Sequence, residues 1–535
     1  MNLTSSIWSS LFDVHRFRLF EATNCSLLDI GSVVVFVVLV LVSEYQWKKY
    51  RNDHNGGERL TERNVPGPIA LPFIGTRWLY YFRYKINKVH EGYQDMFRRY
   101  GDIVKEEALW NIPVVSLKSR EDIEKVLKYP SKYPMRPPTE VTAHYRASRP
   151  DRYANLGLVN EQGEEWHRLR TSLTPELTSG RTMNKIFPEL TSIAVDFNDL
   201  IHHSRNLSTG VVHNFEELAC RLGLESSCAL ILGERLGFLD DIIGPTAQKL
   251  ADAVKEQFCA SRDTFYSLPI WKFVSTSSYR QFVASEDTIY DVISEMVDKA
   301  EKLEEDTYSS DGTRGVFLSI LKAPGVDVRD KKAAIIDFIA AGIKTMGNTL
   351  VFLLYLMAKN KKSQGKLYEE ILRLSRNGEP LDSRSLAEAH YLRACIFESF
   401  RVLPTAPCVA RILEADLNLS QYNLKAGTVV LCHTWLASLD DSNFPNAKTF
   451  MPERWIAEDG TCSSVNCHPF LVVPFGVGRR TCPGKRFVEL ELQVILAQII
   501  QRFEVDFDGE LELDFEFLLA PHAPSNFIMK DRLAV

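Results

Sequence analysis

The chain has 535 residues, of which 45% are hydrophobic and 25% charged, and its formal net charge is −6. These values are ordinary for a globular protein, and the mildly acidic balance gives no general case for nucleic-acid binding. The ten cysteines are scattered without a regular framework, which argues against a secreted protein held together by disulfides.

The N-terminal region contains a short apolar segment. Residues 33–42 are continuously apolar, which is shorter than the ~20 residues of a clean membrane span. No cleavage site follows, and residues 1–29 are too acidic for a typical mitochondrial presequence. We therefore predict that residues 1–50 are a targeting or membrane-anchor segment and that residues 51–65 are a charged linker. Basic residues just after the apolar segment would keep the main body in the cytosol or the mitochondrial matrix.

From Pro66 onward the pattern predicts one helix-rich body. Trp166 and Arg170, four residues apart, share one face of a predicted helix. Residues 331–359 are mostly apolar and predict a buried central helix. Near the C-terminus, residues 431–436 are a strand candidate, and residues 519–524 predict a tight turn between strands.

A charged pair stands in an apolar context further along the chain. Glu398 and Arg401 are spaced i, i+3 on a predicted helix, and apolar residues surround them, so we expect the pair to be buried. A buried arginine and glutamate need further partners. The loop at 450–455 offers Arg454 as such a partner.

The most informative stretch is the glycine-rich segment 475–484, which surrounds Cys482. The pattern of residues 485–503 after it predicts a helix. A cysteine at a helix start meets unpaired backbone N–H groups and the positive end of the helix dipole, which favour a thiolate. Most single cysteines are simply small buried hydrophobes, so the neighbouring residues decide between the two interpretations.

This segment resembles the haem-binding loop of the cytochrome P450 superfamily. The five matching positions of the pattern Phe-x-x-Gly-x-Arg-x-Cys-x-Gly are Phe475, Gly478, Arg480, Cys482 and Gly484. The resemblance implies a mainly α fold with small β-sheets over residues 66–535. It also implies a haem b cofactor whose iron is bound by the Cys482 thiolate, a ligand that favours O–O cleavage.

The resemblance also assigns roles to residues elsewhere in the chain. It makes Trp166, Arg170, Arg411 and Arg480 partners of the haem propionates. It makes Glu398, Arg401 and Arg454 a structural lock under the cysteine loop. In the central helix, Gly342 and Thr345 match the oxygen-binding pattern Ala-Gly-x-acid-Thr-Thr, in which they would make room for O₂ and relay protons.

Lys344 departs from that pattern, because it stands where the family has an acid. Two explanations are open: water reaches the iron by another path, or Lys344 points away and takes no part. The alternative for Thr345 is a purely structural role, in which its hydroxyl donates a hydrogen bond to a backbone carbonyl of its own helical turn.

Within the superfamily, the residues after Cys482 resemble the mitochondrial class. Two basic residues, Lys485 and Arg486, precede Glu-Leu-Glu, and with Lys362 and Lys366 they would dock an acidic ferredoxin supplied by its reductase. The run at 340–349 resembles insect steroid hydroxylases, which implies a small apolar steroid substrate, O₂ and two electrons delivered singly. The location expected is a mitochondrial membrane, on the matrix side.

Two rival functions are left open. One is a xenobiotic or lipid monooxygenase of the endoplasmic reticulum membrane, fed by a flavoprotein reductase, which the N-terminal segment favours. The other is a haem protein of the same fold that does not activate O₂, which only the Lys344 departure favours.

Overall fold

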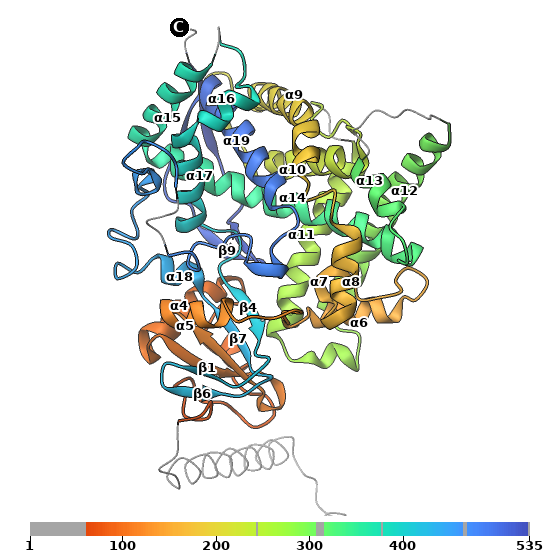
Figure 1. Cartoon of the computed structure of the whole chain (residues 1–535), viewed down its shortest axis with the longest axis vertical. Helices are drawn as coiled ribbons and strands as arrows, with labels where there is room; N and C mark the ends of the chain where they lie inside the picture. Colours follow the sequence, from red (N-terminus) through yellow and green to blue (C-terminus); the bar gives the residue numbers. More distant parts are fainter. Residues whose placement is uncertain (1–59, 242–243, 307–314, 376–377, 464–467, 533–535) are drawn as a thin grey trace, which may run out of the picture. The chain divides into compact units, whose positions relative to one another are not determined.

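The computed structural model describes residues 60–241, 244–306, 315–375, 378–463 and 468–532. The predicted anchor at 1–50 and the first part of the predicted linker, 51–59, lie outside the described residues. The chain divides into two units, Met1–Glu58 with Leu71–Phe73, and Arg59–Ala70 with Ile74–Val535. All helices and strands below belong to the second unit, whose arrangement is drawn in Figure 1.

Helices dominate this unit. Its α-helices are α3 (Leu79–Phe82), α4 (Val89–Tyr100), α5 (Arg120–Leu127), α6 (Glu140–Ser148), α7 (Gly157–Asn160), α8 (Gly163–Leu173), α9 (Gly180–Ser204), α10 (Phe215–Leu232), α11 (Pro245–Tyr266), α12 (Ser277–Asp306), α13 (Gly315–Leu321), α14 (Val328–Lys359), α15 (Lys361–Leu374), α16 (Ser383–Glu388), α17 (His390–Val402), α18 (Thr434–Ser438) and α19 (Lys485–Arg502). Short 3₁₀ turns are η2 (Ile86–Lys88), η3 (Leu109–Asn111), η4 (Pro269–Lys272), η6 (Pro452–Trp455) and η7 (Gly478–Arg480).

The strands form four small sheets. Their bounds are β1 (Ile103–Glu107), β2 (Pro113–Leu117), β3 (Val211–Val212), β4 (Val409–Ile412), β5 (Leu417–Leu419), β6 (Tyr422–Leu424), β7 (Val429–Cys432), β8 (Phe503–Phe507), β9 (Leu513–Phe515), β10 (Leu519–Pro521) and β11 (Phe527–Asp531). The orders are β1-β2-β7-β4, β3-β11-β8, β9-β10 and β5-β6. All strand pairs are antiparallel except β2 with β7, which run parallel.

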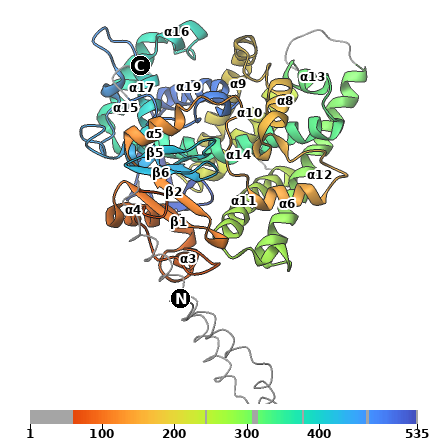
Figure 2. The ribbon, with the colours of Figure 1, turned by 60° about the horizontal axis from the view of Figure 1, so that its bottom comes forward.

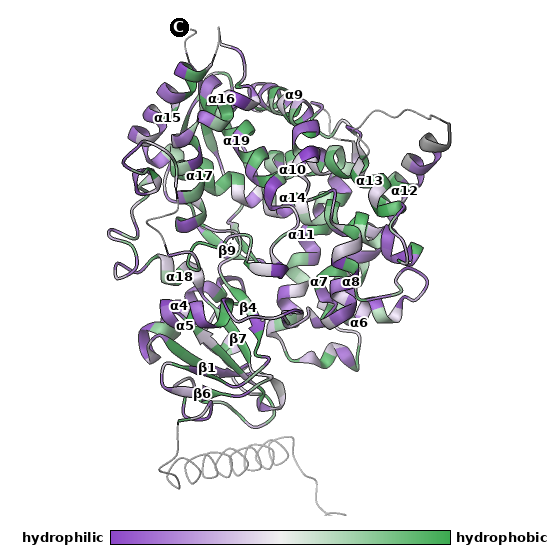
Figure 3. Cartoon of the chain, viewed as in Figure 1, coloured by the Kyte–Doolittle hydropathy of each residue, from purple (hydrophilic) through white to green (hydrophobic). Residues whose placement is uncertain are grey.

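The largest sheet joins early and late parts of the chain. Val114 on β2 pairs with Val429 on β7, so segments more than 300 residues apart share one sheet. Figure 1 and Figure 2 show these orange and cyan strands gathered on one side, with α4 and α5 beside them and most helices on the other side. In Figure 3 the strands around β7 and much of α19 are green, whereas α15 carries many purple, hydrophilic residues.

The core of the helical part is the crossing of α10 and α14. A Cβ added to Gly342 would lie 2.0 Å from Ser227 Oγ, and one added to Gly223 would lie 2.9 Å from the Gly342 carbonyl oxygen. Larger residues are therefore excluded at this crossing. Among the described helices, α14 is the one long and apolar enough to cross a membrane, and 72% of its most apolar stretch is buried within the protein. It is thus the buried central helix that the sequence predicts.

Most predicted elements are present, and two are wrong in detail. The predicted mainly α fold with small sheets is confirmed. Only the start of the predicted strand 431–436 is extended, because β7 ends at Cys432 and α18 follows. The turn predicted at 519–524 starts too early, because residues 519–521 form strand β10, and the connection from β10 to β11 is at 522–526. A tight turn between β9 and β10 lies at 516–518, where Phe517 has a φ of 63°.

Candidate active site

Cys482 lies on a loop that folds back on itself before α19 begins. The Cys482 N–H donates to the Phe475 carbonyl oxygen (2.8 Å), which closes the loop. Gly476 and Gly478 have φ values of 69° and 67°, a region that disfavours other residues. Burial raises the pKa of the Cys482 thiol, whereas hydrogen bonds from the backbone of Gly484 and Lys485 oppose that shift. The loop thus aims N–H groups at the sulfur, as a metal-bound thiolate requires.

Arg480, on the same loop, lies flat on Trp166 of α8. The guanidinium carbon is 3.8 Å from the centre of the indole ring. Its Nε donates to the Pro134 carbonyl oxygen (2.8 Å), and Nη2 donates to that of Glu161 (2.9 Å). Nη1 is buried and has no hydrogen-bond partner. Trp166 therefore positions Arg480, which leaves one donor of this arginine unused.

Three further arginines lie close enough to Arg480 for their charges to act on it. They are Arg136, Arg170 and Arg411, and with Arg480 they form what we call the arginine cluster. Burial, together with the charges of the other three arginines, lowers the pKa of Arg480 to about 9, although the Glu161 carboxylate opposes the shift. Burial also lowers the pKa of each of the other three. Among the described residues, no member of the cluster forms an ion pair with a carboxylate.

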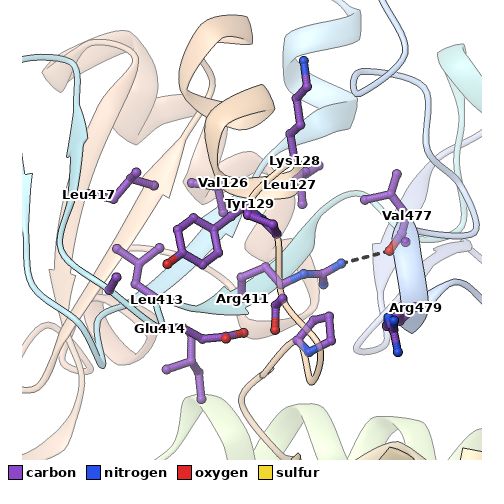
Figure 4. A pocket seen from close by; sticks show the side chains of 16 residues that line it. Val126, Leu127, Lys128, Tyr129, Arg411, Leu413, Glu414, Leu417, Val477 and Arg479 are labelled. Carbon is purple, nitrogen blue, oxygen red and sulfur yellow. Dashed lines mark hydrogen bonds between the residues drawn. The ribbon is translucent and has the colours of Figure 1, made fainter.

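Backbone carbonyls hold the cluster in place. Arg136 donates to Val159 O (2.7 Å), and Arg170 donates to Thr481 O (2.9 Å). Arg411 on β4 donates to Val477 O (3.3 Å), the bond drawn in Figure 4. Arg411 also lines a cavity of about 230 Å³, together with Tyr129, Glu414 and Arg479. Four fixed guanidinium groups without a counter-ion call for a bound dianion.

The two carboxylates of haem fit this cluster, and the iron fits the Cys482 sulfur. The unpartnered Arg480 Nη1 supplies a donor for a propionate oxygen. The sequence pattern had pointed to Trp166, Arg170, Arg411 and Arg480 for this task, and the structure brings the three arginines together, with Trp166 against Arg480. It adds Arg136, which the pattern missed because a lone arginine in a proline-rich loop carries no signal by itself.

Glu398, Arg401 and Arg454, the predicted structural lock, also meet. Arg401 donates to both carboxylate oxygens of Glu398 (2.7 and 2.9 Å), and Arg454 Nε donates to one of them (2.9 Å). Trp455 Nε1 and the Met451 N–H complete the partners of Glu398. Both Glu398 and Arg401 are fully buried. Arg401 also donates to the carbonyls of Ser438 and Ala447, and so ties α17 to the end of α18 and to the loop that follows it.

The middle of α14 combines small residues with hydroxyl groups. Gly342 packs against α10, so the close contact between the two helices requires a glycine here whether or not it also makes space for O₂. Thr345 Oγ1 donates to the Ala341 carbonyl oxygen (2.6 Å), the back-bonded arrangement. One turn on, Thr349 and Thr405 share a hydrogen bond (2.7 Å). The catalytic role of Thr345 and Gly342 stays a prediction.

Lys344 does not contact an acid of its own helix. Its ammonium pairs with Glu516 at the turn between β9 and β10, a partner that the sequence pattern did not indicate.

The predicted docking residues lie on α15 and α19. Lys485 and Lys366 are half-exposed and Lys362 is exposed. Lys366 pairs with Glu453 (2.5 Å), and Arg486 donates to the Thr178 carbonyl oxygen (2.8 Å).

Comparison with known proteins gives one consistent family. The model of the family described as cytochrome P450 matches residues 65–527. The ecdysone 20-monooxygenase of Drosophila melanogaster is 49% identical over 481 residues, which cover 88% of this chain and 89% of that protein. Mitochondrial cytochrome P450 302a1 of the same fly is 30% identical, covering 86% of this chain and 93% of that protein. Its probable mitochondrial cytochrome P450 12b2 is also 30% identical, over 80% and 81%.

Proposed function

The chain belongs to the cytochrome P450 family, and from this membership we propose that it hydroxylates ecdysone to 20-hydroxyecdysone. As a P450 monooxygenase it carries haem held by a cysteine thiolate. The proposal of ecdysone rests on one observation, the 49% identity to a fly ecdysone 20-monooxygenase over nearly the whole of both chains. One oxygen atom of O₂ enters a C–H bond of the steroid, and the other leaves as water with two electrons and two protons.

The residues of this chain hold the cofactor from two directions. Bound haem supplies the iron at which O₂ is activated. Cys482 would bind the iron through its thiolate, which the N–H groups that point at its sulfur stabilise. The arginine cluster would neutralise the propionates, with Arg480 fixed by Trp166. Phe475, Gly478 and Gly484 shape the loop, and Phe475 packs edge-on against Phe400 at 5.3 Å.

On the opposite face, α14 presents the residues proposed to act on protons. The Thr345 hydroxyl donates to the Ala341 carbonyl oxygen at 2.6 Å, and it would have to release this bond in order to hold or move a proton for the reaction. Lys344 does not replace the acid of the family pattern in this relay, because its ammonium forms an ion pair with Glu516. The relay would then depend on Thr345 with ordered water.

The proposed electron donor is a ferredoxin with its reductase. Support comes from the mitochondrial relatives and from the basic residues Lys362, Lys366, Lys485 and Arg486 on α15 and α19. Charge complementarity of this kind gives fast association that weakens with salt. We expect Lys485→Glu with Arg486→Glu to lower turnover with ferredoxin while ecdysone affinity is retained. Lys425→Glu, an exposed lysine on the loop after β6, serves as the control, and equal turnover in both variants would exclude docking at α19.

We also propose that the protein is membrane-associated in mitochondria, on the matrix side. An apolar patch supports the membrane contact; it consists of Ile69, Tyr81, Phe82, Ile270, Phe273 and Val274, all exposed. Its segments adjoin, because the Leu268 N–H donates to Tyr81 Oη (3.0 Å) and Trp78 Nε1 donates to Ile69 O (2.9 Å). Exposed patches of this kind mark interaction sites. Fractionation of cells that express the full chain tests the location, and recovery in endoplasmic reticulum membranes would contradict it.

Two measurements test the central proposal. The reduced carbon-monoxide difference spectrum of the purified protein must show the thiolate-ligand band, and its absence would remove the assignment of Cys482. Turnover of ecdysone is then compared with a ferredoxin system and with a flavoprotein reductase. A hydroxylated ecdysone formed only with ferredoxin supports the proposal. Activity only with the flavoprotein reductase favours an endoplasmic-reticulum enzyme, and no oxygen-dependent product favours a haem protein that does not activate O₂.

A further inference from the structure

Lys344 forms a buried ion pair across the domain. Its Nζ lies 3.0 Å from a carboxylate oxygen of Glu516, and the two side chains are 9% and 12% exposed. Burial lowers the pKa of Lys344, but Glu516, with a smaller contribution from Cys220, raises it above its ordinary value. Lys344 is therefore charged at neutral pH, and Glu516 is its one carboxylate partner among the described residues.

Glu516 begins the hairpin tip, which we define as Glu516–Leu518 between β9 and β10. Phe517, at its centre, has a φ of 63°, which an L-residue adopts only where its surroundings hold it. The Phe517 ring packs edge-on against Phe265 of α11, with centroids 5.7 Å apart. The tip thus lies between the central helix and α11.

The strands beside the tip are held by hydrogen bonds to their backbone. Asn348, one turn after Lys344, donates to the Leu519 carbonyl oxygen (2.9 Å). Arg262 of α11 donates to that of Phe515 (3.1 Å). The Leu519 N–H donates to Thr405 O (2.9 Å). These bonds hold the backbone of Phe515 and Leu519 on the two sides of the tip, whereas the ion pair with Lys344 holds the Glu516 side chain of the tip itself.

We propose that Lys344 is a positioning residue for the substrate. It holds Glu516 and thereby fixes the hairpin tip, with Phe517, beside the part of α14 that carries Thr345. Lys344 and Asn348 form one stripe of the helix against the hairpin, and Thr345 and Thr349 form the adjacent stripe. This inference rests on the proposed function, since the tip would set which carbon of the steroid lies next to the Thr345 stripe.

This role explains why a lysine stands at the acid position of the family pattern. An acid there would repel Glu516 across 3.0 Å in a buried setting, and a neutral residue would leave the Glu516 charge unpaired. The identities of residues 344 and 516 are therefore coupled, although no sequence pattern joins them.

The first test measures the hairpin without any turnover. Hydrogen exchange of the peptide amides at 513–521 is compared in the haem-loaded full chain and in Lys344→Met, Glu516→Gln and the double variant. We expect exchange about tenfold faster in each single variant, because local opening becomes easier. The double variant should exchange no faster than the singles, because it loses the same contact and leaves no buried charge unpaired. The control is Lys332→Met, which breaks an ion pair of α14 with Asp298 instead.

The second test measures ecdysone affinity by spectral titration and the fraction of consumed electrons that appears in product. Lys344→Met and Glu516→Gln should each weaken binding about tenfold and shift the positions that are hydroxylated, because a loosened tip must be ordered on binding. Unchanged exchange and affinity in Lys344→Met would overturn the proposal, as would effects of Lys344→Met that are fully additive with those of Glu516→Gln. If the wild type binds no ecdysone, the proposed function fails while the exchange result still decides whether Lys344 holds the tip.

A third variant guards against misfolding. The double variant Lys344→Met/Glu516→Gln has no unpaired buried charge, so we expect it to unfold at a higher temperature than either single variant. The exchanged pair, Lys344→Glu with Glu516→Lys, should recover much of the hairpin protection and the affinity. Should the double variant unfold at a lower temperature than both singles, the two charges do not act as a pair and the proposal is wrong.

Discussion

The two regions that we propose to face the haem, the cysteine loop with its arginines and the middle of α14, treat charge in opposite ways. On the cysteine side, none of the four arginines of the cluster forms an ion pair with a carboxylate of the described residues, and backbone carbonyls hold them in place. On the α14 side, Lys344 is paired with its own carboxylate, Glu516. One face is therefore prepared for an anionic cofactor, and the other has no net charge to offer a ligand.

This difference follows from what each face must bind. Haem brings two carboxylates, so the protein supplies cations and leaves them uncompensated until the cofactor binds. A steroid brings no charge, so an unpaired cation facing it would lose its hydration free energy without gaining an ionic partner. The Lys344–Glu516 pair keeps a charged side chain compatible with an apolar substrate. The comparison predicts that changes on the cysteine side affect cofactor and fold, whereas changes on the α14 side affect coupling and specificity.

The largest effect is expected at the metal ligand. Cys482→Ser replaces the thiolate by a weaker alcohol ligand, so the thiolate-ligand band should vanish and hydroxylation should fall by more than about 10³-fold. The control is Cys462→Ser, which replaces a half-buried cysteine outside the loop 475–484. It should keep both the thiolate-ligand band and the hydroxylation activity. A normal spectrum in Cys482→Ser would break the assignment of the cysteine side.

The structural lock should show the next largest effect. Arg401→Leu leaves the buried Glu398 with Arg454 as its remaining cationic partner, and we expect it to lower the free energy of unfolding by about 3–5 kcal/mol. Arg454→Leu should cost less, because Arg401 still forms two hydrogen bonds with Glu398. The exposed pair of Lys425 and Asp416 is a control, for which Lys425→Met should cost at most about 1 kcal/mol. Denaturant unfolding of the haem-loaded protein measures all three.

The cysteine side also contains a buried acid whose charge depends on pH. Burial raises the pKa of Glu491, on α19, to about 8. The folded state then binds more protons than the unfolded state from about pH 4.5 to 8. The contribution of protonated Glu491 to the free energy of unfolding is therefore complete below the pKa that Glu491 has in the unfolded chain. It is lost as pH rises through the pKa of about 8 that Glu491 has in the folded protein.

Replacement of Glu491 tests this. The difference in free energy of unfolding between wild type and Glu491→Gln should change by roughly 3 kcal/mol between pH 5 and 8, to the disadvantage of the wild type at high pH. Unfolding at a series of pH values measures it. A difference that does not vary with pH would mean that Glu491 is already ionised in the fold.

The smallest effect is expected on the α14 side. Thr345→Ala should leave stability and the haem spectrum unchanged, while the fraction of electrons that ends in hydroxylated product falls by about tenfold or less, because a proton donor is lost. Thr345→Ser keeps the hydroxyl and should restore coupling. Full coupling in Thr345→Ala would show that its hydroxyl serves only its bond to Ala341.

The sequence by itself determined the features that lie close together in the chain. The loop from Phe475 to Gly484 could be recognised because a cysteine, an arginine and glycines must keep fixed spacings to hold a metal at a helix start. The buried central helix was visible as a long apolar run, and the pair of Glu398 and Arg401 as opposite charges one turn apart. These inferences need only local geometry, since 3.6 residues per turn fix which side chains meet.

Only the tertiary structure decided which distant residues complete each site. Arg136 joins Arg480 because a proline-rich loop packs against the cysteine loop, and Glu516 reaches Lys344 because a C-terminal hairpin lies on the central helix. The strand predicted at 431–436 ended early for a similar reason, since a short apolar run fits a strand and a helix equally well until packing selects one. A charge is satisfied by whatever the fold places beside it, and sequence spacing carries no record of such a neighbour.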